Sequence, residues 1–236
     1  MAKPWVVVDR IIRNSDLILN VLDARFPDKT MNSIIAGRIR SAGKKFFYIL
    51  NKSDLVEIEQ IKRAINYLRD EAPVVAFSAK EQTGKGKLLD FIKRFAKERK
   101  KSIRVGVVGY PNTGKSPIAG FTKGKQWIRL TPDILLIDTP GVIPTKEKSE
   151  VELVMKDAVT QVEDPEGVAT ELLDKLCKKN KLAIEQFYNI EVKDDPYETL
   201  EAIAKAKHKL KKGGLLDLDA AGRMVIEDWQ RGKLVI

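Results

Sequence analysis

A glycine-rich run, Gly109-Tyr-Pro-Asn-Thr-Gly114-Lys115-Ser116, holds the residues whose chemistry is most easily recognised. Its glycines let the backbone curl so that successive N–H groups point at a phosphate, while Lys115 can reach the β and γ oxygens and the Ser116 hydroxyl suits Mg²⁺. The apolar run 103–109 in front of it is typical of a buried parallel strand. Because a strand leads straight into Gly-Lys-Ser, a P-loop is favoured over a chance glycine-rich turn. The loop residues predicted to line a nucleotide are Pro111, Asn112, Thr113, Gly114, Lys115 and Ser116.

A second motif, Asn51-Lys52-Ser53-Asp54, follows another apolar strand and has the residue types needed to read a guanine base. The Asp54 carboxylate can accept hydrogen bonds from the N1–H and N2–H₂ groups of guanine, a pattern that adenine does not offer. The Lys52 stem can lie over the base, and Asn51 can tie neighbouring loops together. The alternative is that Ser53 or Asp54 caps the helix expected to begin near Glu57.

Two further loops end predicted strands. In Asp138-Thr139-Pro140-Gly141 the carboxylate can hold a Mg²⁺-bound water and the Gly141 N–H can touch a γ-phosphate, although these four residues also make an ordinary turn. In Phe77-Ser78-Ala79-Lys80 the Ala79 N–H could donate to guanine O6. All four motifs stand at the carboxyl ends of strands, which is where open α/β sheets bind ligands. The sequence therefore predicts one guanine-nucleotide site with GTP or GDP as its ligand.

The order of the motifs is unusual, because the base-reading motif comes first, the P-loop second and Asp-x-x-Gly last. In this order the residues resemble the circularly permuted ribosome-assembly GTPases of the YlqF/RbgA and nucleostemin type, well over about residues 5–142 and more loosely to the end. Asp23-Ala24-Arg25-x-Pro27 is also similar to a motif of that family, although a strand-end turn without nucleotide contact is an equal alternative.

The resemblance implies GTP hydrolysis as a switch in large ribosomal subunit assembly, with the subunit or its rRNA as partner. It implies Lys115 and Gly141 as catalytic groups, and Ser116, Thr122 and Asp138 as Mg²⁺ ligands, with Thr122 as the switch I threonine. A plain threonine of a β loop is the alternative for Thr122. Asn112 resembles the asparagine that helps to hold K⁺ in related GTPases, or else stabilises its own loop.

Val142 stands where Ras-like proteins carry the glutamine that orients the attacking water. Family members share this hydrophobic replacement, so turnover should be slow until an outside group completes the site. A histidine implicated near the family's N-terminus has no counterpart here, and the only histidine, His208, is far away in sequence.

The spacing after the P-loop is short. Only 21 residues separate Ser116 from Asp138, and the segment after Pro117 has no helical period. A parallel strand crossover needs about a dozen residues or more and usually contains a helix, so about 20 residues are predicted to be absent between Ser116 and Pro117.

The 236 residues suffice for one α/β domain and a smaller one. Strands at 17–23, 46–51, 74–78 and 103–109 alternate with helices at 30–42, 57–71 and 85–100, which predicts a doubly wound α/β sheet of P-loop NTPase type, followed by a hairpin at 126–137. Helices are expected at 168–178, from 196 to about 212, and at 219–232. The predicted domains are 1–145, the permuted GTPase, and 146–236, a small helical domain that binds RNA or the ribosome.

The net charge of +10 is uneven, with +13 in residues 1–142 and −3 in residues 143–236. Basic clusters at 93–104 and 205–212 suit contact with RNA, or are solvated helix faces and helix ends. One cysteine permits no internal disulfide, which suggests a reducing, cytoplasmic location. The sequence shows no signal peptide and no apolar run long enough to span a bilayer.

Two other functions remain open at this point. The first is a GTP-binding module that hardly hydrolyses GTP and acts by occupancy alone. The second is an ATP-dependent P-loop enzyme with a small-molecule substrate, against which Asp54 argues.

Overall fold

The computed structural model describes residues 4–99, 102–115, 118, 127–131, 134–138 and 159–234. The chain divides into two compact units, Met1–Pro144 and Thr145–Ile236. Each unit is built around its own set of buried apolar side chains. None of the described helices has the length and apolarity that crossing a bilayer requires.

The first unit is organised by a six-stranded sheet with the strand order β3-β2-β1-β4-β6-β5. Five strands are parallel, and β5 pairs antiparallel with β6 at one edge. The central strands are apolar along almost their whole length because both faces of a parallel sheet are covered. The strands are β1 Leu17–Asp23, β2 Lys45–Asn51, β3 Val74–Ala76, β4 Ile103–Gly109, β5 Trp127–Thr131 and β6 Ile134–Asp138.

The direction of strand addition reverses between β1 and β4. From β1 the chain adds β2 and then β3 on one side, whereas β4 has β6 and β5 on its other side. Ligands of open α/β sheets bind at such a reversal, beyond the carboxyl ends of the strands. The predicted α/β fold of P-loop type is confirmed, and the P-loop strand β4 lies at the centre of the sheet although it is fourth along the chain.

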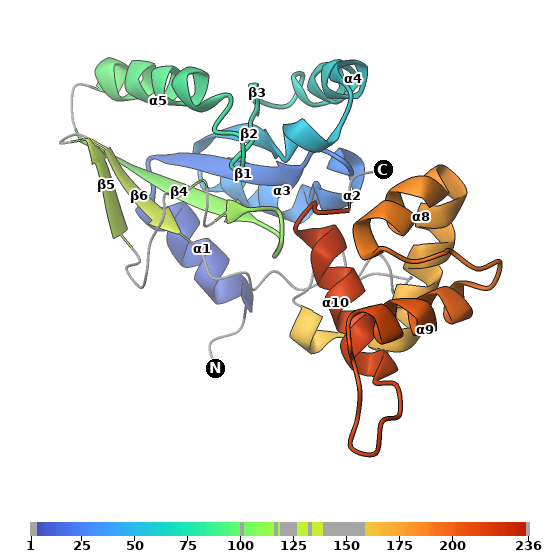
Figure 1. The fold of residues 1–236 in the computed structure, drawn as a ribbon. Coiled ribbons are helices and arrows are strands. Elements are labelled where there is room, and N and C mark those ends of the chain that lie inside the picture. Colours follow the sequence, from blue (N-terminus) through green and yellow to red (C-terminus); the bar gives the residue numbers. More distant parts are fainter. Residues whose placement is uncertain are drawn as a thin grey trace. The chain divides into compact units, whose positions relative to one another are not determined.

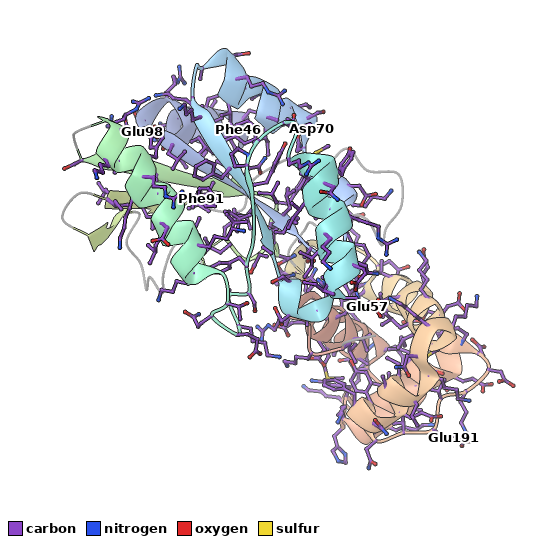
Figure 2. All side chains as sticks on the ribbon, turned by 90° about the horizontal axis from the view of Figure 1, so that it is seen from above. Phe46, Glu57, Asp70, Phe91, Glu98 and Glu191 are labelled. Atoms are coloured by element: carbon purple, nitrogen blue, oxygen red, sulfur yellow. The ribbon has the colours of Figure 1, made fainter. Side chains whose placement is uncertain are left out.

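Helices cover both faces of this sheet (Figure 1). Helices α1 Pro4–Asn14, α3 Ser33–Ser41 and α4 Ile58–Leu68 contribute to the apolar cluster on one face. Helix α5 Lys85–Arg99 covers the other face, where the rings of Phe91 and Phe47 are 5.5 Å apart. Figure 2 shows Phe91 and Glu98 along α5, and Glu57 and Asp70 at the two ends of α4. Burying one such large apolar side chain contributes about 1.5–3 kcal/mol, so these faces fix the sheet that carries the loops.

The predicted elements of this unit agree with the structure to within a few residues, with one omission. The strands 17–23 and 103–109 are found unchanged. The helix predicted at 30–42 is α3, and the short α2 Pro27–Thr30 precedes it. Helix α1 was not predicted, although Val8, Ile11 and Ile12 have helical spacing and are buried. The hairpin is β5 and β6.

The second unit is helical. It contains α8 Pro165–Tyr188, α9 Pro196–Ala206 and α10 Leu218–Gln230, with a short 3₁₀ turn at Val159–Gln161. Each helix is preceded by an aspartate whose carboxylate accepts a hydrogen bond from a backbone N–H of the first turn, as N-caps do. These aspartates are Asp164, Asp195 and Asp217. Gly222 of α10 lies against the start of α8, because an added Cβ would be 2.4 Å from the Pro165 carbonyl oxygen.

Two helix ends in this unit differ from prediction. The helix predicted at 168–178 continues to Tyr188 across a break at Asn180, whose side chain accepts from the Ala183 N–H and restarts the helix. The helix predicted from 196 to about 212 ends at Ala206, because His208 has a left-handed backbone conformation (φ 51°). The basic stretch 205–212 therefore lies mostly in the turn after α9.

Candidate functional site

The candidate site lies beyond the carboxyl ends of β1, β2 and β4, where strand addition reverses. Strands β1 and β4 are adjacent, with Val21 in register with Gly109. Gly109 has φ 147°, and an added Cβ would lie 2.5 Å from the Val21 carbonyl oxygen. Only glycine fits this approach, so the P-loop leaves the sheet tight against the end of β1.

Asn51 joins three of the predicted motifs. Its Nδ2 donates to the Thr113 carbonyl of the P-loop at 2.8 Å, and its Oδ1 accepts from the Ala79 N–H at 3.1 Å. The side chain is buried. Gly114 passes so near that an added Cβ would be 2.1 Å from Asn51 Nδ2. One amide therefore fixes the base-reading loop, the P-loop and the Ser78-Ala79-Lys80 loop in a single arrangement.

The described part of the P-loop is closed around its lysine. Lys115 is buried, and its ammonium donates to the Tyr110 carbonyl oxygen. The Thr113 hydroxyl donates to the same oxygen at 2.8 Å, and the Thr113 N–H donates to the Pro111 carbonyl at 2.7 Å. Asn112 at the loop tip has a left-handed backbone with φ 57°. The Tyr110 carbonyl thus holds the positive charge of Lys115 within the loop.

The base-reading motif forms a tight turn at the end of β2. Lys52 is left-handed (φ 62°) and leads into a 3₁₀ turn at Ser53–Leu55. The Ser53 N–H donates to the Phe77 carbonyl at 3.1 Å, which ties this turn to the end of β3. Asp54 is exposed. The capping alternative is wrong, because α4 has Glu57 at its N-cap and no side chain caps it.

The Ser78-Ala79-Lys80 loop is well ordered by its own contacts. Ser78 is fully buried, and its hydroxyl accepts from the Glu81 N–H at 3.0 Å. The Ala79 N–H, predicted to donate to guanine O6, donates here to Asn51 and would have to exchange that acceptor to reach a base. The Lys80 side chain is exposed and lies 3.9 Å from the Glu81 carboxylate. The loop therefore lies beside the Asp54 turn, and in this structure its Ala79 N–H binds the Asn51 side chain.

A charged cluster of Asp23, Arg25 and Lys52 follows β1 and completes this edge of the sheet. Arg25 and Lys52 each place a cationic nitrogen 2.8 Å from Asp23 Oδ2. Burial alone would raise the pKa of the Asp23 carboxyl, but hydrogen bonds and charge from Arg25 and Lys52 outweigh burial and lower it to about 2. Burial lowers the pKa of the Lys52 ammonium, and the Asp23 carboxylate opposes that change. Asp23 is in register with Asn51, so the cluster adjoins the base-reading motif.

The Asp-x-x-Gly motif is described only at its first residue. Asp138 ends β6 and is in register with Val107 of β4, which brings its backbone beside the P-loop strand. Among the parts of the chain that the structure describes, no three His, Cys, Asp or Glu side chains are grouped to hold a metal ion. Outside the described residues lie Ser116, Pro117, Thr122, Thr139, Pro140, Gly141 and Val142, and with them the Ser116–Pro117 junction.

No family model matches the chain, but the similar proteins are named as GTP-binding proteins or GTPases. The chain is 35% identical over 97% of its length to an uncharacterized GTP-binding protein of Methanocaldococcus jannaschii, of which it covers 65%. It is 35% identical over 98% of its length to Nuclear/nucleolar GTPase 2 of Arabidopsis thaliana, covering 43%. It is 34% identical over 98% to Nucleolar GTP-binding protein 2 of Schizosaccharomyces pombe, covering 47%. The chain thus spans less than two thirds of each of these relatives.

These matches also bear on the short spacing after the P-loop. The match to the Arabidopsis protein extends over 253 residues, more than the 236 residues of this chain. Such relatives therefore have residues without a counterpart here, and the stretch between Ser116 and Asp138 is where the sequence predicts them to be missing.

Proposed function

The chain is a homologue of nucleolar GTP-binding proteins of the nucleostemin-like family, and from this premise we propose that it binds GTP and GDP and hydrolyses GTP as a switch in large ribosomal subunit assembly. The observation that carries the proposal is the Asn51 side chain, which links the P-loop, the base-reading loop and the Ser78-Ala79-Lys80 loop. Separate turns that resembled these motifs by chance would not need a shared buried amide.

Guanine is selected by Asp54 in this proposal, and the Lys52 stem supports the base from its face. The Asp54 carboxylate is exposed, it does not cap α4, and it stands on a turn held by the end of β3. It is thus available to accept from N1–H and N2–H₂ of guanine. A site built around such a polar pair rejects a base that lacks the partner groups far more strongly than a packing contact would. This argues against the ATP-dependent alternative.

Phosphate binding and turnover belong to the P-loop. Lys115 supplies a buried positive charge, and backbone N–H groups of the loop are proposed to donate to the phosphates, for which the Thr113 N–H would have to leave the Pro111 carbonyl. Ser116 and Asp138, with Thr122, are the residues proposed to hold Mg²⁺, which would neutralise phosphate charge. Gly141 is proposed to contact the γ-phosphate. Turnover is expected to be slow, because Val142 cannot orient water, and the left-handed Asn112 at the loop tip is the proposed K⁺ contact.

The proposed partner is the large ribosomal subunit through its rRNA. Exposed cations on α5, namely Lys93, Arg94 and Lys97, give the first unit a basic helix face. The turn after α9 gives the second unit another, from Lys205 to Lys212. A phosphate backbone is attracted by such surfaces. We propose residues 146–236 as an RNA- or ribosome-binding domain that receives the nucleotide state directly, since the chain runs into it from the Asp-x-x-Gly motif.

The cellular location follows the site of subunit assembly. The relatives from Arabidopsis and Schizosaccharomyces are named for the nucleus or nucleolus, so their names do not support a strictly cytoplasmic location, which the sequence led us to expect.

Sedimentation with purified large subunits tests the partner and the switch together. The full chain should bind subunits more tightly with a non-hydrolysable GTP analogue than with GDP, and subunits with K⁺ should raise GTP turnover above that of the protein alone. Nucleotide-dependent binding without turnover under any of these conditions would favour the module that acts by occupancy. Equal affinities for ATP and GTP would instead return the ATP-dependent alternative.

A further inference from the structure

The cluster that follows β1 is held more tightly than a strand-end turn requires. Both oxygens of the Asp23 carboxylate are engaged by Arg25, with Nε 3.0 Å from Oδ1 and one terminal nitrogen 2.8 Å from Oδ2. The Arg25 backbone N–H also donates to Oδ1 at 3.1 Å. Lys52 from the base-reading motif then donates to Oδ2 at 2.8 Å. The Asp23 carboxylate therefore joins the end of β1 to the base-reading motif.

The geometry leaves the carboxylate no freedom to rotate. The bidentate contact from the planar Arg25 guanidinium fixes the plane of the carboxylate. The Asp23 N–H donates to the Thr30 hydroxyl at 3.0 Å, and that hydroxyl donates to the Phe26 carbonyl at 2.8 Å, which fixes the backbone. Oδ2 is consequently aimed at Lys52, and the Lys52 ammonium has a set position rather than a mobile one.

Stability alone is a weak reason for this arrangement. The side chains of Asp23, Arg25 and Lys52 are 6%, 12% and 14% exposed, so three charges have been taken largely out of water. Apolar side chains of similar volume often give a fold that is equally stable or more stable than one with a buried ion pair. What an ion pair provides, and an apolar contact does not, is a defined position for the ammonium.

That position matters because of what Lys52 is joined to. Its neighbour Asn51 is locked by the P-loop, and Lys52 itself has a left-handed backbone that turns the chain toward Asp54. With the backbone set at Asn51 and the ammonium set at Asp23, the four-carbon stem between them is held at both ends. A stem held at both ends is a preorganised surface on which a flat base can lie.

We propose that Asp23, oriented by Arg25, is a positioning residue for guanine-nucleotide binding that acts through Lys52. The inference rests on the proposed function. Asp23 does not touch the nucleotide. It holds the Lys52 stem against the face of the base and so keeps the Asp54 turn beside the edge of the base. The stem contacts the ring face and not the exocyclic groups, so Asp23 strengthens binding of any purine that Asp54 admits without changing which purine is preferred.

Substitutions within the full chain test this. Asp23→Asn keeps the shape of the side chain and removes its charge, and should weaken binding of fluorescent GDP about tenfold, the scale of one charged hydrogen bond. Binding of IDP, which lacks the exocyclic amine, should weaken by the same factor. Lys52→Met keeps an unbranched stem without the ammonium, and adding Asp23→Asn to it should produce no further loss. Asp28→Asn, an exposed aspartate five residues along the chain, is the matched control and should bind GDP like the unmodified protein.

The ammonium itself provides a readout that does not depend on any variant folding. In the unmodified protein, a ¹H–¹⁵N correlation of the lysine ammonium groups should show Lys52 in slow exchange, as a charged hydrogen bond to Asp23 requires. Loss of that signal in Asp23→Asn supports the inference. It is overturned if Lys52 gives no such signal, if Asp23→Asn binds GDP normally, or if it weakens GDP equally with and without Lys52→Met. If the unmodified protein fails to bind GDP at all, the proposed function fails first.

Discussion

Replacing Asn51 by alanine should damage the first unit at two places at once. The substitution removes a donor from the Thr113 carbonyl and an acceptor from the Ala79 N–H, with hydrogen bonds of 2.8 and 3.1 Å. Thr113 is fully buried, so its carbonyl cannot turn to water, whereas Ala79 is only half-buried and can. An unsatisfied buried acceptor costs about 1–3 kcal/mol, and a lost hydrogen bond about 1 kcal/mol more, so a loss of about 2–4 kcal/mol is expected.

Urea unfolding followed by hydrogen exchange measures this loss in the first unit separately from the helical unit. Peptides from β2 and β4 should lose protection at a urea concentration lower by about 1–2 M, given the usual dependence of unfolding free energy on urea. Peptides from α8 and α10 should be unchanged. GDP affinity should fall by more than stability alone explains, because the P-loop and base-reading loop are no longer held together.

Asn51→Asp is the informative companion variant. It keeps an oxygen for the Ala79 N–H but turns the second oxygen toward the Thr113 carbonyl, where two acceptors repel. It should therefore lose GDP affinity at least as severely as alanine does. If Asn51→Ala kept both its urea midpoint and its GDP affinity, the bridge would carry no energy, and the argument that it assembles the site would be refuted.

Three further outcomes are expected. Lys115→Met should abolish GTP turnover while the protein still unfolds cooperatively, and normal turnover would show that this loop is not the phosphate site. The pKa of Asp23 falls from 3.8 to about 2 on folding, so ionisation of Asp23 adds about 2 kcal/mol to the free energy of unfolding. This stabilisation is present above pH 4 and is lost as the pH falls toward 2. The free energy of unfolding of Asp23→Asn should lack this dependence on pH in an acid titration. Gly222→Ala should destabilise the helical unit by about 1–3 kcal/mol, because its Cβ meets the Pro165 carbonyl at 2.4 Å. Gly37→Ala, with nothing within 4 Å, should cost nothing in a parallel unfolding measurement.

The strands and the motif positions were predictable because each depends on local signals. Apolar runs in so highly charged a chain predict buried strands, and turn residues mark the carboxyl ends of these strands. The helix starts at Asp195 and Asp217 were equally predictable, because an N-cap aspartate hydrogen-bonds within its own turn. Helix ends were less predictable, because a histidine does not by itself require the left-handed conformation that His208 adopts after α9.

The contacts within the site could be anticipated only in part. That Asn51 can tie loops together follows from its residue type, but its pairing with the Thr113 carbonyl and the Ala79 N–H depends on strand order. The same order explains why Asp23 was hard to assign. Its partner Lys52 is 29 residues away, and the two meet because β1 and β2 pair in register. Only the spacing Asp-x-Arg before a proline hinted at the cluster.

The most direct test of the central claim is a competition measurement with guanine, xanthine and adenine diphosphates on the unmodified protein and on Asp54→Asn. The unmodified protein should prefer GDP over ADP and XDP by at least about 10³-fold, as a site with a dedicated polar pair does. In Asp54→Asn the amide offers a donor where guanine N1–H needs an acceptor, so GDP should weaken by about 100-fold or more and XDP should become the preferred ligand. If GDP affinity were unchanged by Asp54→Asn, the base-reading assignment would be contradicted, and with it the guanine-nucleotide site.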